Sequence, residues 1–210
     1  MAVRIVALVS TKGGAGKSTL AECLAVAAAK EGQSVYLLDL DPQQSTAAWW
    51  RRRMGPDNPL LVTGVETASR ALALLRQKKA ERDLVIIDTP GSFLGVINDA
   101  IQDAAAIIVV VQSSPKDLEA QGAVEGLIQQ AGLQDRTLYA INRVDRTSTL
   151  TKSAVETLRT KLAREPVLIG DRVEYVRADA SGKVANETNE KARAEIAALW
   201  DAVKGVMANG

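Results

Sequence analysis

The chain has 210 residues, of which 47% are hydrophobic and 24% charged, and its formal net charge is +1. This length and composition predict one folded domain over residues 1–210, and they exclude a polycation or an acidic tail protein. Histidine is absent, which excludes a catalytic triad with a histidine base and a zinc site held by histidine. A disulfide framework is excluded because Cys23 is the only cysteine, and a buried structural thiol is expected there.

Apolar runs of strand type alternate along the chain with longer segments of helical period. The expected strands are 3–10, 34–39, 84–88, 106–112 and 137–142, with weaker runs at 60–63 and 167–169. The expected helices are 18–31, 67–79, 115–131 and 150–164. This alternation predicts an α/β fold, in which helices flank a doubly wound, mostly parallel sheet and the ligand sits at the carboxyl ends of the strands.

The run Lys12-Gly-Gly-Ala-Gly-Lys-Ser-Thr19 follows directly on the first expected strand. It is a deviant form of the phosphate-binding loop, because Thr11 or Lys12 stands where the first glycine usually does. Lys17 is expected to neutralise the β- and γ-phosphates, and the Ser18 hydroxyl to ligate Mg²⁺. The other residues expected to surround the phosphates are Gly13, Gly14, Ala15, Gly16 and Thr19.

Carboxylates stand at the ends of two later strands, near the predicted phosphate site. Asp88 ends one apolar run, and Asp39 and Asp41 follow another with a spacing that places both side chains on the same side of a strand. We expect Asp88 to act as the Walker B residue, Asp39 to reach Mg²⁺ through water, and Asp41 to orient the attacking water. Gly91 is expected to offer its N–H to the γ-phosphate, which makes 88–92 a switch.

Three motifs together resemble the ParA/MinD family of deviant Walker ATPases: the loop at 12–19, Asp39-Leu-Asp-Pro-Gln43 and Ile86-Ile-Asp-Thr-Pro-Gly91. The similarity extends to Arg177-Ala-Asp-Ala-Ser-Gly-Lys-Val-Ala-Asn-Glu187. Since no helix-turn-helix domain precedes the loop, the chain is most similar to the short, ParF-like partition ATPases. The resemblance implies ATP and Mg²⁺ as cofactors and an ATP-dependent sandwich homodimer, in which Lys12 reaches the phosphates of the partner subunit.

The segment Ile141-Asn-Arg-Val-Asp145 follows the sixth expected strand. The resemblance implies that Asn142 contacts adenine, with Arg143 as a stacking partner for the base. The same segment also resembles the Asn-Lys-x-Asp loop of GTPases, whose aspartate reads guanine, and a polar turn accounts equally well for Asp145. ATP is favoured because the other motifs all indicate the partition family.

Residues 136–183 hold ten Lys or Arg against six Asp or Glu. This excess fits sequence-independent contact with a DNA backbone, for which Arg164, Arg172 and Arg177 are the candidates, and it fits a solvated charged surface equally well. Trp49-Trp-Arg-Arg-Arg53 could also bind nucleic acid, but a helix with one tryptophan in the core and its arginines in solvent is favoured. The apolar spacing after Arg193 indicates either a membrane-targeting helix or, as its balanced charges favour, a helix packed on the protein's own sheet.

The sequence therefore predicts a partition ATPase whose ATP-bound dimer binds nonspecific DNA and drives segregation of a plasmid or chromosome. A ParB-like centromere-binding or adaptor protein is expected to stimulate hydrolysis. The alternatives are positioning of a protein cargo on the nucleoid, a MinD-like membrane-associated regulator, and a metabolic ligase of the same fold. A cytoplasmic, nucleoid-associated location without stable membrane association is expected, since the chain shows no leader and no apolar run of membrane-spanning length.

Overall fold

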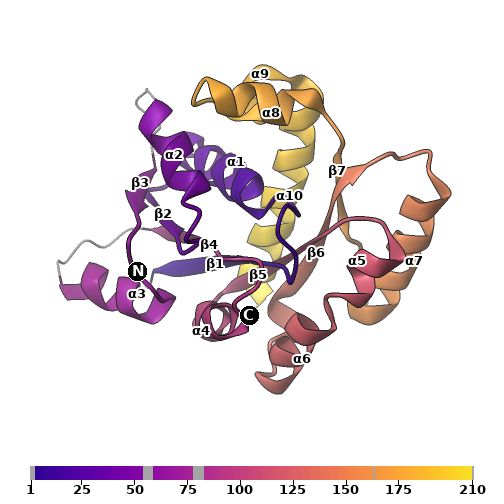
Figure 1. Ribbon diagram of the computed structural model, residues 1–210, viewed down its shortest axis with the longest axis horizontal. Helices are drawn as coiled ribbons and strands as arrows, with labels where there is room; N and C mark the ends of the chain where they lie inside the picture. The colour runs from indigo at the N-terminus through magenta and orange to yellow at the C-terminus, as the bar shows by residue number, and fades with distance from the viewer. Residues whose placement is uncertain (1–2, 54–58, 78–82, 163, 210) are drawn as a thin grey trace.

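The computed structural model describes residues 3–53, 59–77, 83–162 and 164–209 (Figure 1). In these ranges the strands form one parallel sheet in the order β3-β2-β4-β1-β5-β6-β7. Their bounds are β1 Arg4–Val9, β2 Val35–Asp39, β3 Leu60–Val62, β4 Leu84–Asp88, β5 Ala106–Val111, β6 Thr137–Val144 and β7 Val167–Gly170. The chain winds outward in both directions from β1, which confirms the doubly wound α/β fold and places a ligand crevice at the carboxyl end of β1.

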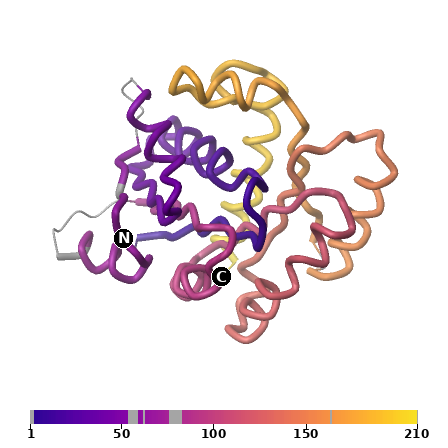
Figure 2. The backbone as a smooth tube through the Cα atoms, viewed as in Figure 1, coloured from indigo at the N-terminus to yellow at the C-terminus, as the bar shows by residue number. Residues whose placement is uncertain are grey.

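Helices cover both faces of this sheet (Figure 1). One face carries α3 (Ala68–Gln77), α4 (Leu94–Gln102), α5 (Pro115–Glu119), α6 (Gly122–Gln130) and α7 (Thr149–Leu162). The other carries α1 (Lys17–Lys30), α2 (Ser45–Arg52) and α10 (Glu190–Asn209), together with the short α8 (Val173–Ala180) and α9 (Ala185–Thr188). The C-terminal elements return over α1 and α2, so that segments far apart in the sequence lie side by side (Figure 2).

The central strands are apolar throughout because both of their faces are buried. In β5, Ile107, Val109 and Val111 pack into the core on one face. Ala106, Ile108 and Val110 pack into the core on the other. Alternation along a strand sends neighbouring side chains to opposite faces, so a strand between two helical layers reads as a continuous hydrophobic run.

The predicted helix over 115–131 is two helices, α5 and α6, which meet near Gln121. Ser114 caps α5, its hydroxyl accepting from the Asp117 N–H, and Pro115 occupies the first turn. The buried Gln121 side chain donates to the Asp117 carbonyl and accepts from the Thr11 N–H. The junction between α5 and α6 is thereby fastened to the loop that follows β1.

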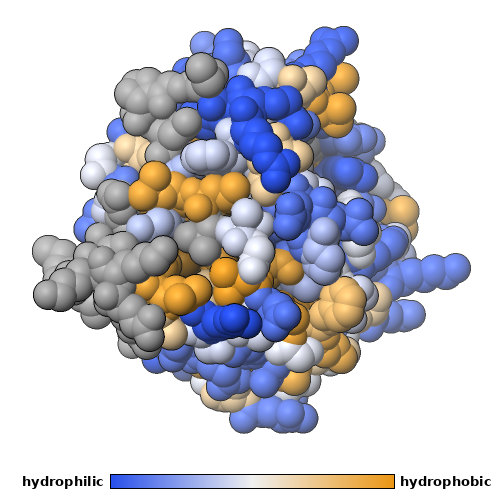
Figure 3. Space-filling model, turned by 60° about the vertical axis from the view of Figure 1, so that its left-hand side comes forward, coloured by the Kyte–Doolittle hydropathy of each residue, from blue (hydrophilic) through white to orange (hydrophobic). Residues whose placement is uncertain are grey.

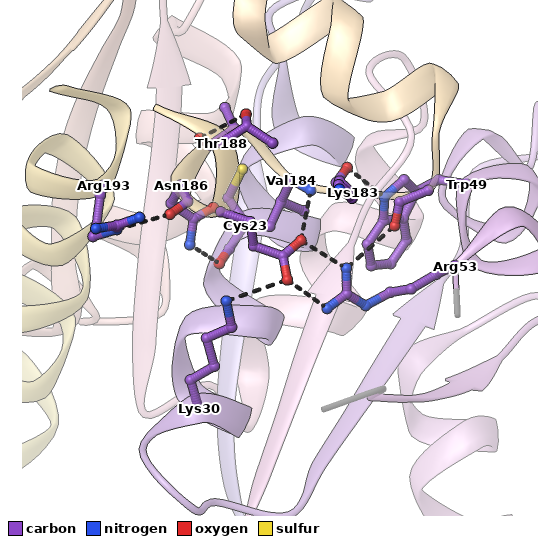
Figure 4. Close-up of polar contacts among 12 residues, drawn as sticks. Cys23, Lys30, Trp49, Arg53, Lys183, Val184, Asn186, Thr188 and Arg193 are labelled. Atoms are coloured by element: carbon purple, nitrogen blue, oxygen red, sulfur yellow. Dashed lines mark hydrogen bonds and ion pairs between the residues drawn. The ribbon is translucent and has the colours of Figure 1, made fainter. Parts of the chain in front are cut away.

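Two motifs noted in the sequence, 49–53 and 177–187, dock against each other (Figure 4). Trp49 is buried, and its indole N–H donates to the Lys183 carbonyl at 3.0 Å. Arg53 pairs in bidentate fashion with Glu187 at 2.9 and 3.1 Å. Gly182, at φ +67°, lies so close to the Arg52 backbone that a Cβ would overlap it. We call these contacts of 49–53 with 179–187 the α2–α9 clamp.

The clamp corrects one prediction about the 49–53 run. The tryptophan in the core is confirmed by Trp49, and Arg51 is exposed as expected. Arg53 was predicted in solvent and is buried, because Glu187 from α9 accompanies it below the surface. Arg52 also leans on α8, where it bonds to the Asp179 carbonyl and carboxylate.

The C-terminal helix α10 packs against the sheet, as its balanced charges indicated. Ile196, Leu199, Trp200 and Val203 lie fully buried in the core shared with α1. Cys23 is buried in the same layer, as expected for a structural thiol. Among the described residues, none of the helices combines the length and the apolar character that a bilayer crossing requires.

Candidate functional site

The glycine-rich loop joins the carboxyl end of β1 to the start of α1. Gly14 and Gly16 adopt φ values of +77° and +97°, which glycine tolerates best. A Cβ on Gly16 would overlap the Asn142 side chain, so the position also requires glycine for space. Because α1 begins after Gly16 without a side-chain cap, its first N–H groups are directed at the loop and can bind an anion.

Lys17 is a buried cation in this loop. Its Nζ lies 3.5 Å from the Lys12 carbonyl oxygen. Burial lowers the pKa of Lys17, and the nearby charges of Asp88 and Asp41 oppose that shift. Burial disfavours the charged form of Lys17, and a phosphate group bound in the loop would stabilise that form.

Lys12 points outward from the same loop. Its Nζ pairs with Asp117 Oδ1 at 2.6 Å, and Asp117 Oδ2 accepts from the Ser114 hydroxyl at 2.6 Å. Burial raises the pKa of Asp117, but the hydrogen bonds from Lys12 and Ser114 outweigh it and the pKa is lowered. Sequence reasoning did not identify Asp117; the Ser-Pro-x-Asp start of α5 marks it as a capping residue near the end of β5.

Asp39 and Asp41 both line a cavity of about 390 Å³ at the end of β2. The Asp39 carboxylate is buried and accepts from the N–H groups of Asp41 and Ala47, which fastens it to the first turn of α2. Asp41 is half-exposed and accepts from the Gln43 N–H at 2.9 Å. Of the two carboxylates that line the cavity, Asp41 is therefore the more accessible to solvent.

Hydrophobic side chains border this cavity. Its lining includes Phe93, which is exposed together with Leu94, Leu60 and Leu74. On the side of the molecule that carries β3 and α3, hydrophobic residues gather between hydrophilic ones (Figure 3). Asp41 thus lies at the edge of an apolar surface.

Asp88 is fully buried at the end of β4. Its Oδ2 accepts from the Thr46 hydroxyl at 2.9 Å, and Oδ1 has no hydrogen-bond partner among the described residues. The nearby Ser18 side chain opposes the rise in the pKa of Asp88 that burial causes. Burial raises the pKa of Asp88 to about 7. Thr46, which sequence reasoning missed, is placed here by the first turn of α2.

These oxygens fit a magnesium ion. A buried carboxylate oxygen without a partner and an adjacent hydroxyl are the hard ligands that Mg²⁺ takes, and it obtains the rest from phosphates and water. Within the described ranges, no group of three or more His, Cys, Asp or Glu side chains is placed to hold a metal ion. Ser18 and Asp88 lie together as predicted, with Asp39 paired to Asp88 across neighbouring strands.

Gly91 lies against the phosphate loop. A Cβ at this position would stand 2.7 Å from the Gly13 nitrogen and 2.8 Å from the Lys12 carbonyl carbon. The 88–92 segment, which was predicted to sense hydrolysis of the γ-phosphate, is therefore in close backbone contact with the phosphate loop at Gly91.

A second cavity, of about 530 Å³, opens beside the loop and is lined by Gly16, Thr19, Asn142, Arg143, Gly170, Asp171, Arg172, Tyr175, Val176 and Asp179. Asn142 bridges β6 and the loop, because its Nδ2 donates to the Ala15 carbonyl at 2.8 Å. Arg143 is exposed at φ +55°. The Asp145 carboxylate accepts from the Thr147 N–H and hydroxyl in its own turn, as the polar-turn interpretation of this residue describes.

The three candidate DNA-binding arginines do not share one surface. Arg164 donates to the carbonyls of Asp135 and Thr137 at the start of β6. Arg172 lies just after the carboxyl end of β7, the strand that runs parallel to β6. It lines the second cavity and pairs with Glu195. Arg177 is exposed on α8. Arg164 and Arg172 therefore lie at opposite edges of the sheet, although they are close in sequence.

A parallel sheet, a glycine-rich loop feeding a helix, and a buried carboxylate at the next strand end define a P-loop nucleotide-binding protein. Residues 6–185 match the family described as the CobQ/CobB/MinD/ParA nucleotide binding domain. The chain belongs to this family.

Relatives within this family include partition and positioning proteins. The chain is 32% identical over 123 residues to Protein ParA of Rhizobium radiobacter, a match that covers 59% of this chain and 54% of that one. It is 40% identical over 116 residues to the maintenance of carboxysome distribution protein A of Gloeobacter kilaueensis, covering 53% and 45%. The matches thus span about half the length of these two relatives. The structure of a putative plasmid partition protein from Borrelia burgdorferi bound to AMPPNP matches with a TM-score of 0.75, 19% identity and 99% coverage of both chains.

Proposed function

We propose that the protein is a Mg²⁺-dependent ATPase of the partition type, which hydrolyses ATP to ADP and phosphate. The observation that carries this proposal is the loop itself: Lys17, the first residue of α1, is buried near Asp88, and the helix begins without a side-chain cap. A buried lysine, directed N–H groups and a partnerless carboxylate oxygen together match a nucleotide phosphate with its metal ion.

Each residue of the site has a distinct role in this proposal. The N–H groups of 13–19 and the Lys17 ammonium bind the phosphates, while Ser18 and Asp88 hold Mg²⁺ and Asp39 contacts it through water. Asp41, at the surface of its cavity, orients the attacking water. When bound, Mg²⁺ neutralises charge that develops on the phosphoryl oxygens. Asn142 contacts the adenine.

ATP-dependent dimerisation is proposed through Lys12. In its pair with Asp117 the lysine side chain is 57% exposed and the aspartate side chain 8%. Ion pairs with a solvent-exposed cation contribute little, on the order of 0–1 kcal/mol, and the Ser114 hydroxyl stays hydrogen-bonded to Asp117 when Lys12 leaves. The phosphates of a partner subunit's ATP can therefore displace Asp117 at small cost. A cation delivered across the dimer then couples hydrolysis to association.

The ATP-bound homodimer is proposed to bind nonspecific DNA on the nucleoid, and a ParB-like partner to stimulate hydrolysis, so that a plasmid or chromosome is segregated. Of the three arginines, Arg177 is exposed and remains the candidate phosphate contact. A second candidate function, positioning a protein cargo on the nucleoid, is favoured by the 40% identity to a carboxysome distribution protein.

The proposal is tested by ATP turnover with and without Mg²⁺, comparing the parent with Lys17→Ala. The control is Lys191→Ala, which removes an exposed lysine of α10. Only Lys17→Ala should lose turnover, and ATP should be preferred to GTP. Anisotropy of labelled random-sequence duplex should show tighter binding with ATP than with ADP, falling steeply with salt. DNA binding that is indifferent to nucleotide and salt contradicts the DNA part alone.

A further inference from the structure

The second cavity is built by three separate parts of the chain around the phosphate loop. Gly16 and Thr19 come from the loop and α1, Asn142 from the end of β6, and 170–179 from the turn after β7 and α8. Its volume of about 530 Å³ falls in the range of small-molecule sites, about 300–1,000 Å³. A nucleotide whose phosphates lie on the loop places its nucleoside here.

One wall of this cavity is an arginine held in a fixed plane. Arg172 Nε lies 3.1 Å from Glu195 Oε2, and the NH2 nitrogen lies 2.6 Å from Oε1. This bidentate geometry leaves the guanidinium little freedom to rotate. Glu195 belongs to α10, 23 residues further along the chain, and the Tyr175 hydroxyl also contacts it at 3.4 Å.

The backbone behind the pair holds it in place. A Cβ on Gly170 would stand 3.0 Å from both the Arg172 NH2 nitrogen and Glu195 Oε1. The ion pair therefore lies flat against Gly170. The Arg172 side chain is 22% exposed and that of Glu195 only 6%, so most of the guanidinium is already covered by protein.

The electrostatics of the pair distinguish Arg172 from a surface arginine. Burial raises the pKa of Glu195, but hydrogen bonds from Arg172 and the Gly170 N–H outweigh it and the pKa is lowered. Glu195 is thus ionised and compensates the charge of Arg172. A compensated, largely covered guanidinium is poorly suited to DNA phosphates, whereas its flat face still stacks on an aromatic ring.

We propose that Arg172, held in plane by Glu195, is a base-contacting residue of the nucleotide site, on which the purine ring stacks. This inference rests on the proposed function, because it needs ATP and ADP to bind at the phosphate loop. Glu195 is then a positioning residue, which links α10 to the nucleoside end of the site. Arg172 therefore belongs to nucleotide recognition and not to the DNA contact.

The test is titration calorimetry of the full chain with ADP and with inorganic tripolyphosphate, which binds the loop but has no base. Arg172→Ala should weaken ADP binding about tenfold, as expected for a partly desolvated cation–π contact, and leave tripolyphosphate binding unchanged. Arg172→Lys should behave like Arg172→Ala, since a lysine offers no flat face. Glu195→Gln should give a smaller loss in the same direction.

Two matched controls keep the test specific. Arg146→Ala removes an arginine that lies 3.6 Å from the same Glu195 but does not line the cavity. Arg177→Ala removes an exposed arginine of the same helix as the cavity wall. Both should bind ADP as the parent does.

ADP affinity within twofold of the parent in Arg172→Lys, which retains a charge opposite Glu195, overturns the inference. An equal loss for ADP and tripolyphosphate also overturns it, because the effect would then be general to the site. A parent that binds neither ligand instead overturns the proposed function and the inference with it. Circular dichroism melting identifies any variant that fails to fold. If Arg172→Ala fails to fold, the ADP affinity of Arg172→Lys decides the test.

Discussion

Two ion pairs in this molecule have similar distances, but the cation of one is exposed to solvent and the cation of the other is buried. At the phosphate loop, Lys12 and Asp117 pair at 2.6 Å with the lysine side chain 57% exposed. In the α2–α9 clamp, Arg53 and Glu187 pair at 2.9 Å with side chains 4% and 18% exposed. The exposure of the cation decides what each pair can do. Lys12 can leave Asp117 for water while the Ser114 hydroxyl stays hydrogen-bonded to that carboxylate, whereas Arg53 cannot leave Glu187 without remaining a buried charge.

The surroundings reinforce the difference. Arg53 also donates to the Gly182 carbonyl, and Lys30 approaches Glu187 at 3.2 Å, so the clamp is a network that ties α1, α2 and α9 together. Lys12, by contrast, has Asp117 as its salt-bridge partner within the described part of the chain. Lys12, which has this one salt-bridge partner among the described residues, can exchange that partner easily. Arg53 and Glu187 are held by several contacts at once and are therefore fixed.

The largest loss of stability is expected on removing the Arg53 side chain from the clamp. Arg53→Ala removes the buried bidentate partner of Glu187 and leaves it with the more exposed Lys30, and should lower the free energy of unfolding by about 3–5 kcal/mol. Urea denaturation measures this, with the exposed Arg51→Ala as the control, expected within about 0.5 kcal/mol of the parent. Similar stabilities for the two variants contradict the structural role of the clamp.

A smaller loss is expected where the clamp requires glycine. Gly182 and Gly132 share a φ of +67°, but a Cβ on Gly182 meets the Arg52 backbone and one on Gly132 meets nothing within 4 Å. Gly132→Ala should cost about 1 kcal/mol for the backbone alone. Gly182→Ala should cost about 1–3 kcal/mol more for the overlap. Equal costs in thermal melts would show that the two segments are not in close contact.

The free energy of unfolding at acidic pH should also depend on the Arg53–Glu187 pair. Burial raises the pKa of Glu187, but hydrogen bonds from Arg53 and the Val184 N–H outweigh it and lower the pKa to about 2. A depressed folded-state pKa gives stability that is present above the unfolded-state value of 4.5 and is lost as pH falls toward about 2. Unfolding free energies measured from pH 5 to 2.5 should therefore fall more steeply for the parent than for Glu187→Gln. Parallel profiles would assign the acid sensitivity to other carboxylates.

The smallest effect on stability is expected at the phosphate loop. Lys12→Ala and Asp117→Asn should each change the free energy of unfolding by no more than about 1 kcal/mol. Lys12→Ala should nonetheless stay monomeric with ATP, whereas Asp41→Ala should accumulate as an ATP-bound dimer. Light scattering after size exclusion measures both. A Lys12→Ala protein that dimerises like the parent would contradict its cross-subunit role.

The sequence predicted the sheet well, since strands buried on both faces leave continuous apolar runs that no other element explains. It missed α4 as an element, because nine residues give too few turns for a clear period. The helical interpretation of the 49–53 run indicated α2 but did not locate its start at Ser45. Ion-pair partners were harder to predict than the elements, because they lie far apart in the sequence. Asp117 lies 105 residues from Lys12, and Glu187 lies 134 from Arg53. A charge excess along 136–183 indicated a surface, but only folding shows that its arginines divide between two sheet edges.

The order in which the site is completed follows from the contact between Arg172 and Glu195. During synthesis the phosphate loop and Asp88 emerge first, and every strand up to β7 precedes the helix that carries Glu195. The carboxylate that fixes the Arg172 side chain is thus supplied by α10, the last helix among the described residues. This wall of the second cavity is complete only once α10 has packed against β7.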